Sequence, residues 1–355
     1  MSIQPLTSHP REISVTEPIE PAFDRVKLML FRPFNLTRWI MIGFCAWLAG
    51  LGESGGGGGG FNGFNGFNDN HANHSGKVNF NQEPVREQFR HFYHDASDYI
   101  IANLVWIIPV AAVLFLVALG IGLLVLWLNS RGKFMFLHCV ALNRAEVEAP
   151  WSAWAGEANS LFKFKVVLSL IGLVLTLPLV IFLAINIIQM VASQELDAAK
   201  LIISIVLFVA LLLLAIVFAI IQKLTADFVV PIMFLRREKC LGAWREFLGL
   251  LKSRPGTFVI YILFQIVLNL VITAMVVMAM LITCCTAACF LAIPFLGTVL
   301  MLPVIIFQRA YSLHYLAQFG AQYNVFPQPP EPPVQPAAPP SSPDAPIPTI
   351  SPLTP

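Results

Sequence analysis

Two histidines and two aspartates share one face of a short predicted helix. His91, His94, Asp95 and Asp98 lie at positions i, i+3, i+4 and i+7, and residues at these spacings are neighbours on a helix. Imidazole and carboxylate groups bind zinc and other transition metals, so this face is a weak candidate for a metal site. A polar, solvated helix face explains the same pattern, and it is the interpretation that we prefer.

The six cysteines do not form a zinc-binding motif, because none has a CxxC or Cys/His zinc spacing. Cys284, Cys285 and Cys289 cluster at a predicted turn between two apolar segments, and Cys285 and Cys289 are one helical turn apart. A disulfide and palmitoylation are two chemical alternatives for this cluster. Small apolar thiols that pack between helices are the simpler interpretation.

Two groups of polar residues accompany the apolar segments. Gln265, Asn269 and Thr273 recur every four residues and form a stripe on one predicted helix. Such a stripe either lines a path for a substrate or forms hydrogen bonds between membrane helices, and we favour the second. Lys223 and Asp227 form an i, i+4 pair just beyond another apolar segment. They are either a buried ion pair of a transporter or a pair at the inner headgroup level, and again we favour the second.

Two low-complexity segments carry no recognised chemistry. Residues 55–60 are all glycine, but a phosphate-binding loop also needs Lys and Ser/Thr at fixed offsets before a helix. Phe-Asn repeats follow instead, which indicates a flexible linker. Residues 321–355 are rich in proline and predict a disordered tail. Its Pro-x-x-Pro spacings lack flanking Lys or Arg, so a spacer is favoured over recruitment of an unidentified protein partner.

The elements that hold these residues are membrane helices. Hydrophobic residues make up 57% of the 355 residues and charged residues only 12%, whereas soluble domains carry about 25% charge. Residues 201–221 contain Ser204 as their only polar side chain, and about 20 apolar residues suffice for a helix to cross a bilayer. We predict an all-α membrane fold with six spans, at residues 35–52, 99–128, 161–192, 201–221, 258–283 and 289–307.

The distribution of basic residues predicts the orientation of these spans. Eighteen of the 22 Lys and Arg residues fall on the side that also holds both termini. The positive-inside rule then places both termini in the cytoplasm. We predict three regions: a flexible lead at residues 1–18, a helical membrane domain at 19–320, and the tail at 321–355. The glycine-rich loop at residues 53–97 lies on the non-cytoplasmic side.

A short pattern recurs where the even-numbered spans reach the cytoplasm. Residues 138–144, 231–237 and 303–309 each have an aliphatic centre and end in Arg. We predict three units, each a cytoplasmic amphipathic helix followed by a transmembrane hairpin. The predicted anchors to the anionic inner leaflet of the bilayer are Trp151, Trp154, Trp244, Arg144, Arg237 and Arg309.

The run FVVPIMFLRREKCLGAWREFLGLLKSRPGTFVIY, at residues 228–261, carries a family resemblance. A proline near the end of one span is followed by a basic helix with a tryptophan and then by the next span. In this the chain resembles uncharacterised bacterial multi-pass membrane families, domains of unknown function related to the membrane domain of glycerophosphodiester phosphodiesterases. The resemblance implies an α-helical inner-membrane protein of unknown role. The phosphodiesterase domain is missing, so its activity is not implied.

We expect a non-enzymatic integral membrane protein that acts as a scaffold or accessory subunit. The sequence offers no catalytic constellation and no cofactor motif, and its expected partner is the lipid bilayer rather than nucleic acid. A small-molecule transporter or channel with a polar path along the fifth span is the alternative. A membrane metalloenzyme built on His91 and His94 is the third hypothesis.

Overall fold

The computed structural model describes residues 13–52, 104–192, 198–283 and 293–327. Within these ranges 87% of residues are helical and none lies in a strand, so the all-α prediction is confirmed for this part of the chain. Several predictions concern residues outside it and remain predictions. These are the candidates His91, His94, Asp95 and Asp98, the cluster of Cys284, Cys285 and Cys289, the glycine-rich loop, and the tail beyond residue 327.

Four helices in the described ranges are long and apolar enough to cross a membrane. They are α4 (Leu104–Leu142), α6 (Ala155–Ala192), α7 (Ala198–Leu224) with its continuation, and α10 (Pro255–Ile282). The first and sixth predicted spans are less regular. Helix α2 (Leu36–Gly50) has only 15 residues, and the last apolar segment is divided into α12 (Pro294–Leu300) and α13 (Leu302–Ala317).

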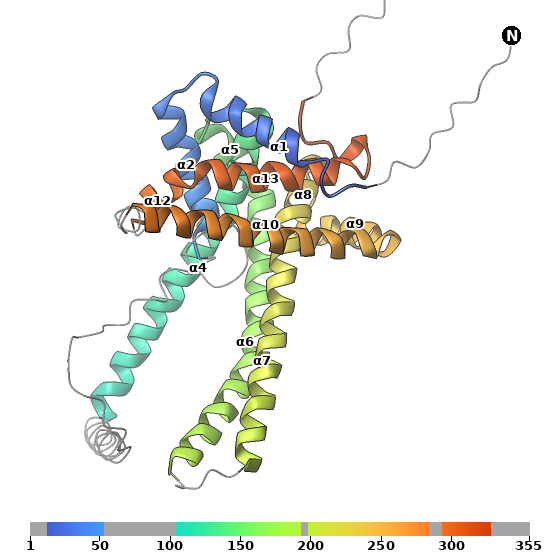
Figure 1. Cartoon of the computed structure of the whole chain (residues 1–355). Helices are drawn as coiled ribbons and strands as arrows, with labels where there is room; N and C mark the ends of the chain where they lie inside the picture. Colours follow the sequence, from blue (N-terminus) through green and yellow to red (C-terminus); the bar gives the residue numbers. More distant parts are fainter. Residues whose placement is uncertain (1–12, 53–103, 193–197, 284–292, 328–355) are drawn as a thin grey trace, which may run out of the picture.

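The long helices project from a packed region at one end of the molecule. Helices α4, α6 and α7 extend away from this region in Figure 1. The most apolar 18-residue stretch of each has no buried residue, and side chains such as Phe115 and Val174 are exposed. Surface of this kind is unfavourable in water and favourable in lipid. The projecting lengths therefore have the surface of membrane helices.

The packed region is built around aromatic side chains. Phe228 lies in the short π-helix η3 (Thr225–Val229), which joins α7 to α8 (Val230–Arg236). Its ring centroid lies 4.9 Å from Tyr261, 5.3 Å from Phe258 and 5.4 Å from Phe247. These three partners come from α10 and α9 (Cys240–Ser253). Phe228 thus connects η3, at the base of α7, with α9 and α10.

Each of the four long helices contacts a neighbouring helix that runs antiparallel to it. The contacts join Gly132 of α4 to Leu48 of α2, Gly172 of α6 to Phe218 of α7, and Asn269 of α10 to Gln308 of α13. However, α10 and α13 lie across α6 and α7 rather than beside them (Figure 1). The predicted arrangement of six spans in three equivalent hairpins is therefore not established.

Helices occur at the three places where surface helices are predicted, and their position at a membrane surface remains a prediction. Helix α1 (Ile19–Val26) continues into η1 (Lys27–Phe31), α5 (Glu148–Ala153) carries Trp151, and α9 carries Trp244. The third copy of the repeated pattern differs from the other two. Arg144 follows the end of α4 and Arg237 caps α8, but Arg309 lies inside α13, which continues to Ala317.

Gly132 lets α2 and α4 approach closely. A Cβ at this position would lie 2.5 Å from Ala49 N and 2.5 Å from Leu48 C, both backbone atoms. Because backbone cannot move aside cheaply, Gly132→Ala should lower the free energy of unfolding by about 1–3 kcal/mol. Thermal unfolding in detergent measures the change. Gly122→Ala on the same helix is the control, since nothing lies within 4 Å of its Cβ; equal melting temperatures for the two variants would contradict the contact.

Segments from opposite ends of the described chain are joined by hydrogen bonds. Ser14 N donates to Gln318 Oε1 at 2.8 Å, and Gln318 Nε2 donates back to Ser14 O at 2.9 Å. Nearby, the Phe326 ring stacks on His314, with centroids 4.2 Å apart, and the Arg25 guanidinium lies 4.9 Å from the same ring. Burial and the charge of Arg25 lower the pKa of His314 from its ordinary 6.5 to about 4.

This lowered pKa makes stability depend on pH. The folded state favours neutral His314, so its contribution is complete above pH 6.5 and is lost as the pH falls toward 4. We expect about 1 kcal/mol less stability from this group at pH 5 than at pH 7, since the ring is half-buried and partly screened. The drop in melting temperature between these pH values should be smaller in His314→Phe, which keeps the stacking. An unchanged drop would refute the assignment.

Candidate functional site

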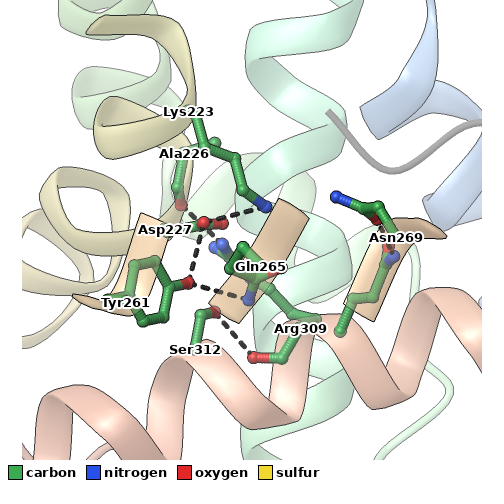
Figure 2. A network of polar contacts seen from close by, with 9 residues as sticks. Lys223, Ala226, Asp227, Tyr261, Gln265, Asn269, Arg309 and Ser312 are labelled. Atoms are coloured by element: carbon green, nitrogen blue, oxygen red, sulfur yellow. Dashed lines mark hydrogen bonds and ion pairs between the residues drawn. The ribbon is translucent and has the colours of Figure 1, made fainter. Parts of the chain in front are cut away.

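Four polar side chains meet where α7 enters the packed region, and we call them the Asp227 network: Lys223, Asp227, Tyr261 and Gln265. Asp227 Oδ2 lies 2.9 Å from Lys223 Nζ and accepts a hydrogen bond of 2.9 Å from Tyr261 OH. Gln265 Nε2 in turn donates to Tyr261 OH at 3.2 Å. Figure 2 shows these side chains converging from α7, η3 and α10. Three of the four are recognisable in the sequence, but as two separate features, the Lys223–Asp227 pair and the stripe that contains Gln265.

The π-helix η3 places Asp227 in this position. Lys223 is in the last turn of α7, and Asp227 is in the middle of the wider π-turn. Thr225 Oγ1 donates to Ile221 O at 2.6 Å, and Arg309 of α13 donates to Ala226 O. Single π-turns of this kind inside α-helices are often found at functional sites. Here the turn directs the carboxylate toward α10.

The Asp227 network is buried within protein. Asp227 is 7% exposed and Gln265 3% exposed, while the Lys223 side chain is 18% exposed. The sequence favours a surface pair of Lys223 and Asp227 at the headgroup level, and the burial of Asp227 corrects this interpretation. Within the described chain Gln265 Oε1 has no hydrogen-bond partner. Removing one member of a buried pair is more destabilising than the pair is stabilising, because the other charge is left uncompensated.

The predicted polar stripe on α10 is divided between two environments. Gln265 belongs to the Asp227 network, whereas Asn269 Oδ1 accepts a hydrogen bond of 2.7 Å from Gln308 of α13. Asn269 and Thr273 are both exposed. The bond between Asn269 and Gln308 joins two helices, as the packing interpretation requires.

Several arginines bond to backbone carbonyls near the ends of helices. Arg25 donates to Val140 O and Ala141 O, Arg38 to Asn143 O, and Arg237 to Ala153 O. Carbonyls in the last turn of a helix have no partner within the helix, and the dipole there favours a positive charge. Arg237 and Arg309 are two of the predicted lipid anchors. Their guanidinium groups donate hydrogen bonds to backbone carbonyls of the protein instead. Arg144 remains exposed, 3.9 Å from Glu146.

Trp154 differs most from its predicted role as a membrane-surface anchor. It is 6% exposed, and its ring stacks on Phe234, with centroids 4.2 Å apart. The Arg237 guanidinium carbon lies 3.2 Å from the centroid of the Trp154 ring. Protein therefore covers this ring, so it packs in the core rather than against lipid. Trp151 and Trp244 are half-buried.

Comparison with known protein families assigns the chain to one of them. A family model matches residues 13–326, which include every helix that the structure describes. The chain belongs to a family of unknown function, DUF7544. No curated protein and no solved structure matched it. The DUF7544 match carries no link to the membrane domain of glycerophosphodiester phosphodiesterases, so that part of the resemblance stays a prediction.

Two parts of the site in this DUF7544 chain were not predicted from the sequence. Tyr261 is 34 positions from Asp227 and lies at the start of an apolar helix, where nothing distinguishes it from a packing residue. The π-turn has no sequence pattern of its own. Among the described residues no group of three or more His, Cys, Asp or Glu could hold a metal ion.

Proposed function

We propose that this protein is a non-enzymatic integral membrane protein that serves as a scaffold or accessory subunit. One observation carries the proposal: the projecting lengths of α4, α6 and α7 expose apolar side chains along their length, and none of the residues in the most apolar stretch of each is buried. The polar groups at their base are bonded to one another. This arrangement supports a structural role in the bilayer.

We extend the proposal to the topology. The spans form three hairpins in a bacterial inner membrane, with both termini in the cytoplasm and an anionic inner leaflet as the lipid partner. The distribution of Lys and Arg and the antiparallel contacts of the helix pairs support this topology. Alkaline phosphatase fused at residue 75 should be active and at residue 147 inactive, because the enzyme folds only outside the cytoplasm. The reverse result would overturn the orientation.

The role as a scaffold is tested by purification and by transport assays. Full-length protein extracted in mild detergent should carry one membrane partner in stoichiometric amount, and deleting residues 328–355 shows whether the tail recruits it. In proteoliposomes the pure chain should move no more solute than empty vesicles. If the pure chain takes up solute, and Gln265→Leu and Asn269→Leu abolish this uptake while the protein stays folded, the result would support the transporter and contradict the scaffold.

A further inference from the structure

Two tryptophans enclose an arginine where α4, α5 and α6 meet. The Arg131 guanidinium lies 5.1 Å from the Trp127 ring centroid and 5.3 Å from that of Trp151. The two rings meet edge to face, with centroids 5.8 Å apart. Trp127 Nε1 donates to Asn159 Oδ1 of α6 at 3.2 Å. We call these four residues and Lys163 the tryptophan-arginine cluster.

The tryptophan-arginine cluster carries positive charge that no carboxylate of the described residues pairs with. Lys163 follows Asn159 by one helical turn, so both lie on the same face of α6. In the described part of the chain neither Arg131 nor Lys163 forms an ion pair. Of the five N–H donors of Arg131, one bonds to Trp151 O, and Nε is buried without a partner. Glu157, the acidic residue nearest to Lys163 along α6, faces Arg237 at 3.7 Å.

The cluster lies at the end of the apolar lengths of α4 and α6. Leu123 and Leu124 precede Trp127, and Val167 and Leu170 follow Lys163; all four are exposed. Tryptophan and arginine at the end of an apolar helix are characteristic of the membrane interface. Basic groups between transmembrane helices on the cytoplasmic side bind anionic lipid headgroups. Charged donors and an apolar surface for acyl chains are thus continuous here.

We propose that the tryptophan-arginine cluster binds the phosphate of an anionic phospholipid, with Arg131 and Lys163 as its donors. The acyl chains lie along the exposed apolar faces of α4 and α6. Trp127 and Trp151 hold the Arg131 guanidinium in place by cation–π contact. This inference rests on the proposed membrane role and names one lipid class at one site.

Melting temperature in detergent tests the proposal with full-length protein. Dioleoyl phosphatidylglycerol should raise it more than dioleoyl phosphatidylcholine, and inorganic phosphate without lipid should not raise it. Arg131→Gln and Lys163→Gln should each weaken apparent phosphatidylglycerol binding about five-fold, the loss of one near-surface charge. Arg131→Lys should keep most of the preference. Lys252→Gln, which removes an exposed charge on α9, is the matched control.

Each outcome decides the proposal. Equal responses to the two lipids would overturn it, and so would an equal loss in Lys252→Gln, which would indicate a general charge effect. Stabilisation by inorganic phosphate alone would point to a free anion instead of a lipid. The proposed membrane role fails separately, if alkaline carbonate releases the protein from membranes.

Discussion

Asp227→Ala is expected to lower the free energy of unfolding by about 3–5 kcal/mol, because it leaves the Lys223 charge without its partner. The substitution also removes the acceptor of the Tyr261 hydroxyl, which is fully buried. For a chain of this size the melting temperature should fall by about 10 °C. Thermal unfolding of the purified protein in detergent measures this fall.

The double variant Lys223→Met, Asp227→Leu is the control for this prediction. It removes both charges and fills the space with apolar side chains, which proteins often tolerate well. We therefore expect it to recover a large part of the stability that Asp227→Ala loses. If the single and double variants were equally destabilised, shape rather than charge would explain the effect.

Trp154→Ala is expected to cost about 3–5 kcal/mol, as for other large aromatic residues removed from a core. The cavity would open between Phe234 and Arg237, the two closest partners of the ring. Trp106→Ala is the matched control, since Trp106 is 76% exposed on the projecting part of α4. It should change stability by less than about 1 kcal/mol in detergent. Similar losses for both tryptophans would contradict the buried position of Trp154.

The apolar runs predict the long helices because composition alone is enough to distinguish a membrane span from a soluble helix. A run such as residues 201–221 has no polar face, so it indicates a span without knowledge of its neighbours. The last predicted span shows the limit of this argument. The sequence pattern predicts that Arg309 marks the end of a membrane segment, yet α13 continues for eight more residues. The Arg309 side chain bonds to Ala226 O in η3, within the protein.

The roles of single residues were harder to predict than the helices. Tryptophan beside arginine is typical both of membrane interfaces and of cation–π contacts inside a protein. Only the approach of Phe234 and Arg237 shows that Trp154 belongs to the second kind. Lys223 and Asp227 are recognisable as a pair in the sequence because they are one helical turn apart. The pairing of Asp227 with Tyr261 depends on how α10 crosses η3, which no local pattern encodes.

The bonds between Ser14 and Gln318 have a consequence for the order of assembly. These residues are 304 positions apart, so at a synthesis rate of about 5–20 residues per second the first precedes the second by about 15–60 s. During this interval the side of α1 that carries Ala22 and Val26 has no α13 to cover it. An amphipathic helix in this situation binds to a membrane surface. Helix α1 is therefore expected to rest on the bilayer during translation and to transfer onto α13 when the last helix has been inserted.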